Sequence, residues 1–255
     1  MSDAELTVTV TGPVATVVIH NPARRNAMTP TMWRRLPVLL DGLEADPAVR
    51  VLVLTGAGGT FCAGADLGDL DELLAAGDGS IAVAAEERLA AFGRPTVAAI
   101  EGACVGGGCQ LAVACDLRLA AADARFGVPP ARLGLVYPVP TTRRLVGLVG
   151  PSAAKHLLFT GDLVDADRAL RIGLVDEVLP AAALAERVAA LTATIAERSR
   201  LTVTAAKEIV DGRAGADRIA WWHAQVRDSG EAREGVAAVN ERRPPRFDWT
   251  PPAYD

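Results

Sequence analysis

The chain begins with two short segments in which apolar and polar residues alternate. Leu6–Val10 and Val14–Ile19 have this period of two, which is typical of half-buried strands, and the sequence TGP between them favours a hairpin turn. Thr29 has the residue type of a helix N-cap, and a proline at position 30 suits the first turn of a helix. We therefore predict a β-hairpin followed by a helix over 30–44.

Longer apolar runs, which are typical of buried strands, alternate with helical segments through the middle of the chain. The pattern predicts strands at 49–56, 95–102 and 116–121. It also predicts one helix at 81–92 and another that follows the glycines at 106–108 and ends at residue 114. After Pro151 the pattern is mostly helical, and the proline-rich tail from residue 241 is expected to be extended. Alternating strand, loop and helix units indicate an α/β fold.

Composition narrows the range of functions. Half of the 255 residues are apolar, which allows a sizeable core, and a net charge of −5 argues against a protein that binds nucleic acid. We identify no signal peptide and no apolar stretch of membrane-spanning length. The four cysteines form no C-x-x-C pair and no metal-site spacing, so we expect reduced thiols, a cytoplasmic protein and no bound metal.

Three consecutive glycines, Gly106, Gly107 and Gly108, directly precede an apolar helical stretch. A glycine-rich turn at a helix N-terminus presents unpaired backbone N–H groups and the positive end of the helix dipole. Neither the Walker pattern nor the Rossmann pattern follows these glycines. Two interpretations remain open, which are close packing of the helix and binding of an anion or oxyanion.

A second loop of small residues, FCAGADL at 61–67, lies at another junction between a strand and a helix. Two such loops can each direct one N–H at the same oxygen atom. A pair of backbone donors in this arrangement is an oxyanion hole, which stabilises negative charge that develops on a carbonyl oxygen.

Seven segments of the chain resemble, in order, those of one enzyme family. The segments are NPARRNAM, VLVLTGAGGTFCAGADL, PTVAAIEGACVGGGCQLAVACDLRLA, ARFGVP, LGLVYP, TGDLVDADRALRIGLVDEV and REGVAAVNERRPPRF. On these segments the chain is identified as a member of the enoyl-CoA hydratase/isomerase family, the crotonases, with the resemblance running from about residue 6 to 247.

The resemblance implies a fold, an assembly and a ligand. Residues 1–195 would form a core spiral of β-β-α units, and residues 196–255 a helical C-terminal region that joins subunits into homotrimers, often paired as hexamers. The substrate would be an acyl-CoA thioester, with coenzyme A entering as part of the substrate and no separate cofactor.

The same resemblance implies roles for individual residues. The N–H groups of Ala65 and Gly107 would bind the thioester oxygen, and the glycine run would be bare because the thioester lies against it. Arg24 and Arg25 match the position that contacts the CoA phosphates, and arginine suits phosphate chemically. The remaining residues expected to contact substrate are Ala27, Ala63, Asp66, Leu67, Gly106, Gly108 and Pro130.

Two positions depart from the pattern of the hydratases. Hydratases of this family use two glutamates to position and activate water, and here Gln110 and Pro130 occupy those positions. Neither an amide nor a proline ring exchanges a proton near neutral pH. We therefore expect chemistry other than simple hydration.

Tyr137 supports one version of that chemistry. Methylmalonyl-CoA decarboxylases of the family are similar in having a tyrosine in an L-G-x-x-Y segment, and decarboxylation forms a thioester enolate without a base. Tyr137 would then donate the proton, although it could equally be a packing residue.

Two other readings remain open. One is a hydratase or isomerase that uses a displaced acid, and the other is a catalytically silent acyl-CoA binder. The acids in or beside 68–80 are each expected to be solvated charges, and they are Asp69, Asp71, Glu72, Glu86 and Glu87.

Overall fold

The computed structural model describes residues 4–66, 68 and 79–251. Its main sheet has six strands in the order β1-β2-β3-β4-β6-β9, in which β1 and β2 form an antiparallel hairpin and the other neighbours are parallel. The strands are β1 (Glu5–Thr11), β2 (Val14–His20), β3 (Val51–Gly56), β4 (Thr96–Ile100), β6 (Leu117–Ala121) and β9 (Glu177–Leu179).

A second, smaller sheet carries the chain past the glycine run. Its order is β5-β7-β8, with β5 (Ala103–Val105) parallel to β7 (Arg125–Gly127), and β7 antiparallel to β8 (Val164–Asp165). The helices are α1 (Pro30–Ala45), α3 (Ile81–Ala90), α4 (Gly107–Ala114), α5 (Pro130–Leu133), α6 (Val139–Thr160), α7 (Ala166–Arg171), α8 (Ala181–Glu197), α9 (Arg200–Val210), α10 (Ala216–Ser229) and α11 (Glu231–Glu241). The predicted α/β class is confirmed.

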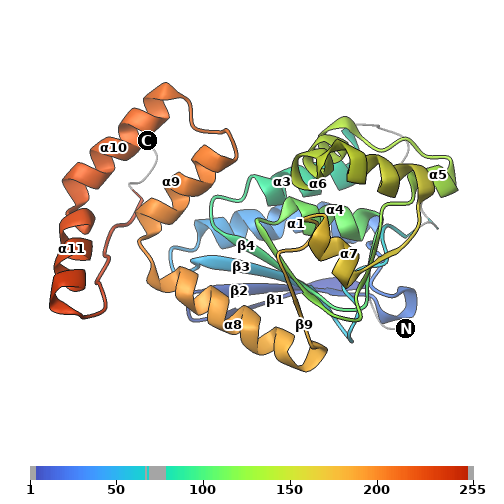
Figure 1. Cartoon of the computed structure of the whole chain (residues 1–255), viewed down its shortest axis with the longest axis horizontal. Coiled ribbons are helices and arrows are strands. Elements are labelled where there is room, and N and C mark those ends of the chain that lie inside the picture. The colour runs from blue at the N-terminus through green and yellow to red at the C-terminus, as the bar shows by residue number, and fades with distance from the viewer. Residues whose placement is uncertain (1–3, 67, 69–78, 252–255) are drawn as a thin grey trace.

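Both faces of the main sheet are buried along its central parallel strands β3, β4 and β6. Along β3, Leu52 and Leu54 join the core under α1, α3 and α4, whereas Val51 and Val53 pack with α8 on the opposite face (Figure 1). Strands that are buried on both faces read as continuous apolar runs rather than as alternating patterns. This explains why the parallel strands carry unbroken runs of apolar residues, while the β1–β2 hairpin alternates.

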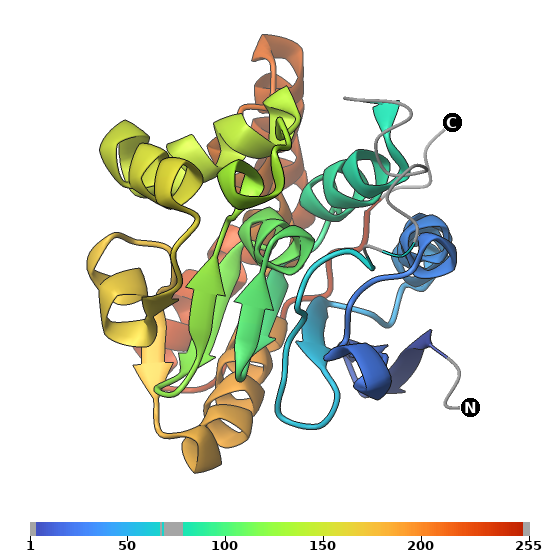
Figure 2. The ribbon, with the colours of Figure 1, turned by 90° about the vertical axis from the view of Figure 1, so that its right-hand side faces the viewer.

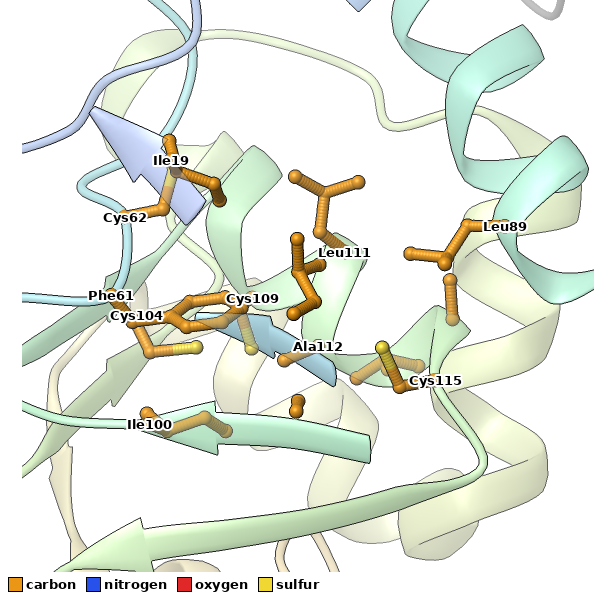
Figure 3. Packing of buried hydrophobic residues seen from close by; sticks show 14 of the residues in the cluster. Ile19, Phe61, Cys62, Leu89, Ile100, Cys104, Cys109, Leu111, Ala112 and Cys115 are labelled. Atoms are coloured by element: carbon orange, nitrogen blue, oxygen red, sulfur yellow. The ribbon is translucent and has the colours of Figure 1, made fainter. Parts of the chain in front are cut away.

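Helix α4 occupies the middle of the molecule, with α3 on one side and α6 on the other (Figure 2). Every residue of α4 after Gly107 is buried. The four cysteines are also buried and unpaired, and they pack among aliphatic and aromatic side chains around this helix (Figure 3). The helix that follows the glycine run is therefore held rigidly on all sides.

The C-terminal helices α9, α10 and α11 form an arm beside the layered core (Figure 1). Helix α8 still packs on the sheet, so the boundary predicted at residues 195/196 falls in its last turn. One ion pair ties the arm to the core, because Lys207 Nζ on α9 lies 2.7 Å from Asp116 Oδ1 and 2.5 Å from Oδ2. Asp116 also accepts hydrogen bonds from the backbone N–H and the hydroxyl of Thr96.

Replacement of Lys207 by methionine is expected to lower the free energy of unfolding by about 1–3 kcal/mol, because it leaves Asp116 without its cation. The Lys207 side chain is only 6% exposed, whereas that of Asp116 is 27% exposed and keeps some contact with water. Urea denaturation measures the difference, and Lys155→Met on the exposed face of α6 is the control. Equal stability of Lys207→Met and the parent protein would contradict the structural role.

Candidate active site

The segment NPARRNAM forms a tight turn held by one buried amide. Asn26 donates from Nδ2 to the carbonyl oxygens of Ala57 (2.8 Å) and Thr60 (2.6 Å), and its Oδ1 accepts from the Asn21 N–H at 2.9 Å. Arg24 and Arg25 are exposed on the outside of this turn. The turn therefore fixes two cations beside the loop that begins at residue 61.

The loop at 61–66 is anchored so that one N–H is left over. Met28 donates to the Gly64 carbonyl at 2.8 Å and accepts from the Asp66 N–H at 2.9 Å, so the intervening Ala65 N–H points away from Met28. Within the described ranges, the Ala65 N–H has no hydrogen-bond acceptor. A backbone donor without a partner at a loop surface is available to a ligand.

The Gly107 N–H is the second donor. Gly106 is the N-cap of α4, with φ 56° and ψ −125°, and Gly107 is the first residue of the helix. Its N–H also has no acceptor among the residues that the structure describes. The two donors are close, because a Cβ built on Gly107 would lie 3.6 Å from Ala65 N, and one built on Gly64 would lie 3.8 Å from Gly107 N.

Packing accounts for two of the three glycines. A Cβ on Gly108 would lie 2.3 Å from the Cys62 carbonyl oxygen, and one on Gly107 would lie 3.0 Å from Cζ2 of Trp33. The two interpretations of the glycine run are therefore compatible. Close packing against Cys62 and Trp33 brings the loops together, and this leaves the N–H groups of Ala65 and Gly107 side by side.

A cavity of about 360 Å³ lies over this N–H pair. Its wall is mainly apolar, but three buried polar atoms in it have no hydrogen-bond partner among the described residues: Trp33 Nε1, Gln110 Oε1 and Gln110 Nε2. Buried polar atoms are almost always paired in proteins, so unpaired ones in a cavity wall indicate a polar ligand or water there. A larger hollow of about 970 Å³ lies between α9 and the core, and neither N–H donor lines it.

Tyr137 lies in the wall of the same cavity. Its hydroxyl would be 3.4 Å from a Cβ built on Gly106, and the side chain is half-buried. Burial raises the pKa of the Tyr137 phenol, and the nearby Cys109 and Glu86 raise it further. The hydroxyl therefore stays protonated across the physiological range.

The other predicted contact residues are spread more widely. Ala63, Gly106 and Gly107 line the cavity, but Pro130 is buried at the start of α5 and its neighbour Pro129 forms the wall instead. Pro130 itself does not line the cavity, so the predicted contact between Pro130 and substrate is not supported there. As a proline, it also provides no carboxylate at this position. Among the remaining predicted contacts, Ala27 is buried and Gly108 packs on Cys62. The Oδ1 atom of Asp66 accepts a hydrogen bond from Gly68 N. Leu67 lies outside the described residues, as do Asp69, Asp71 and Glu72.

The expectation that Glu86 is a solvated charge is wrong. Its residue exposure is 3%, and its side chain lines the cavity that contains the N–H pair. Thr141 on α6 donates a hydrogen bond to Glu86 Oε2 at 2.5 Å. The neighbouring Glu87 is exposed, as expected, and forms an ion pair with Arg144.

A signal for this burial exists in the sequence. Glu86 is three residues from both Val83 and Leu89, so all three lie on the face of α3 that turns inward. A polar residue on an apolar helix face therefore indicates that Glu86 is buried, which was not predicted. The position of Trp33, whose ring lies against Gly107, was not predicted either.

The model of a family described as enoyl-CoA hydratase/isomerase matches residues 9–250. The chain belongs to the enoyl-CoA hydratase/isomerase family. It shares 36% identity over 198 residues with a crotonyl-CoA hydratase of Syntrophomonas wolfei, covering 76% of each chain, and 32% over 251 residues with a 2,3-dehydroadipyl-CoA hydratase of Escherichia coli, covering 96% and 98%.

Solved structures of the enoyl-CoA hydratase/isomerase family share the fold. A crystal structure of one family member superposes with a TM-score of 0.93 at 40% identity and covers 98% of both chains. Among the described residues, no helix is long and apolar enough to cross a membrane, and no three His, Cys, Asp or Glu side chains gather as metal ligands.

Proposed function

We propose that this protein binds an acyl-CoA thioester and stabilises its enolate at the N–H groups of Ala65 and Gly107. The observation that carries the proposal is the pair of unpartnered donors at the floor of a mainly apolar cavity. An N–H pair of this kind stabilises charge that develops on the carbonyl oxygen, and an apolar wall strengthens that interaction by excluding water.

The proposed chemistry differs from two-glutamate hydration. Gln110 presents an amide to the cavity, and Pro130 supplies no side chain that can move a proton. Decarboxylation of a malonyl-type thioester suits this site, because loss of CO₂ leaves the electron pair on the enolate without any base. The enolate then needs one proton, for which the Tyr137 hydroxyl is a candidate donor.

A second candidate is supported by a specific observation, the buried Glu86. A carboxyl group in the cavity wall permits isomerisation or hydration through a displaced acid. Both candidates pass through the same enolate. A catalytically silent binder is disfavoured, because a scaffold has no need of two unpaired N–H groups that point into a cavity.

The nucleotide end of the substrate is proposed to lie outside the cavity. Arg24 and Arg25 are exposed beside the 61–66 loop, where their guanidinium groups can reach phosphates. We further propose a cytoplasmic homotrimer or hexamer. The exposed Val210, Val236 and Val239 on the C-terminal arm support subunit contacts, and four reduced cysteines support a reducing compartment.

Two assays test the proposed function. The protein should exchange the hydrogens next to the carbonyl of butyryl-CoA for deuterium in D₂O, because the enolate forms reversibly. Hydration of crotonyl-CoA should be slower than the usual enzyme range of about 1–10³ s⁻¹. Mass spectrometry measures both reactions, and loss of CO₂ from methylmalonyl-CoA is a further readout. Hydration within that range would overturn the decarboxylase-like candidate in favour of the second one. A protein that neither exchanges butyryl-CoA nor decarboxylates methylmalonyl-CoA would contradict the proposal.

A further inference from the structure

One carboxyl group in the cavity over the Ala65 and Gly107 N–H groups lies at neither of the two glutamate positions of the family's hydratases. Glu86 projects from α3 into the wall that also contains Gly107, Gln110 and Tyr137. We propose that Glu86 is the catalytic residue that moves a proton to and from the carbon next to the thioester carbonyl. The proposal rests on the proposed function, because the proton must leave or join an enolate.

The surroundings of Glu86 hold its carboxyl in place without neutralising it. Thr141 donates to Oε2, and among the described residues no arginine or lysine forms an ion pair with Glu86. Arg144 on α6, whose charge acts on Glu86, forms its ion pair with Glu87 instead. A buried carboxyl without a cation costs folding free energy, and such groups concentrate at functional sites.

Groups on α3 and α6 set the electrostatics of Glu86, namely Glu87, Thr141 and Arg144. The Tyr137 phenol also interacts with Glu86, and the Cys109 thiol of α4 interacts with Tyr137. Burial raises the pKa of Glu86 to about 7, opposed by the Thr141 hydrogen bond and by Arg144, while Glu87 adds to the rise. Both protonation states are therefore populated near neutral pH, as a group that takes and returns a proton requires.

The proton transfer can be written completely. The Glu86 carboxylate accepts a proton from the α-carbon, and the C–H electron pair becomes the carbon–carbon double bond of the enolate. The π electrons of the carbonyl move onto its oxygen, and the Ala65 and Gly107 N–H groups donate hydrogen bonds to that negatively charged oxygen. In the reverse direction the protonated carboxyl returns its proton to the α-carbon, and the carbonyl re-forms. No oxidant or second reactant is needed.

The substrate class follows from this step. The ligand would be a CoA thioester with at least one hydrogen on the α-carbon, or one that gains that hydrogen when it loses CO₂. The unpaired Gln110 amide and Trp33 Nε1 in the same wall offer hydrogen bonds to a polar atom of the acyl chain or to a water beside it.

The experiment compares deuterium exchange of butyryl-CoA by the parent protein and by Glu86→Gln. Glutamine keeps the shape of the side chain but cannot exchange a proton, so the rate should fall by about 10²–10⁴-fold. Affinity for butyryl-CoA, measured by calorimetry, should stay within a few-fold. Glu186→Gln, at an exposed position of α8 on the opposite face of the main sheet, is the control and should exchange at the parent rate.

The pH profile gives a second readout. Removal of the α-proton needs the carboxylate, so exchange by the parent protein should rise with pH and level off above about pH 7. Thr141→Val removes a hydrogen bond that favours the carboxylate, and it should move the inflection to higher pH.

The outcomes separate the two proposals. Exchange by Glu86→Gln at the parent rate would overturn the role of Glu86 and leave the enolate site standing, with Tyr137→Phe as the next comparison. A flat pH profile, or an inflection that Thr141→Val leaves in place, would overturn it as well. If the parent protein exchanges nothing but decarboxylates methylmalonyl-CoA, only the role of Glu86 fails. If it does neither, the proposed function fails as well.

Discussion

Replacement of Gly107 by valine is expected to lower turnover by at least about 10²-fold, a loss typical of a damaged oxyanion hole. A Cβ at this position would lie 3.0 Å from Cζ2 of Trp33 and 3.6 Å from Ala65 N. The two methyl groups of valine would fill the space in front of both donors, while the Gly107 N–H itself remains. The thioester carbonyl could no longer approach the pair.

Affinity for free CoA should change little in the same variant, because the nucleotide is proposed to lie against Arg24 and Arg25 outside the cavity. Turnover, calorimetry with CoA and thermal unfolding together distinguish a blocked site from a misfolded one. The control is Gly42→Val, since Gly42 is exposed on α1 and a Cβ there would meet no atom within 4 Å. Full activity in a folded Gly107→Val protein would overturn the oxyanion hole.

Local chemistry predicted much of the fold. Thr29 does cap α1 by accepting a hydrogen bond from Met32 N. This signal works because an N-cap bonds to a residue only three positions away. The strands β5 and β7 were not predicted, because each has three residues and is defined by pairing with a distant part of the chain.

The site shows the same division between local and distant causes. The two small-residue loops could be found in the sequence because bare N–H groups require glycine-rich turns at helix starts. The packing reason for the glycines could not be found in the sequence, because Gly107 contacts Trp33 and Gly108 contacts Cys62 only in the folded protein. The burial of Glu86 likewise depends on α6, which brings Thr141 to it across 55 positions.

Ala65→Pro gives a direct test of the other donor, because proline has no N–H. The Ala65 N–H has no acceptor among the described residues, so its removal should cost no internal hydrogen bond. Loss of one oxyanion donor should reduce turnover by about 10²–10³-fold. The loop should keep its place, because its anchors to Met28 use the Gly64 carbonyl and the Asp66 N–H instead.

The comparison for Ala65→Pro is Ala65→Gly, which removes the methyl group and keeps the donor. If the backbone N–H carries the effect, the glycine variant should lose far less activity than the proline variant at similar affinity for CoA. Proline also restricts the residue before it, and Gly64, at φ 118°, has the freedom to adjust. Circular dichroism and thermal unfolding show whether the loop has moved. A folded Ala65→Pro protein with the turnover of Ala65→Gly would mean that Gly107 alone, or another group, stabilises the enolate oxygen.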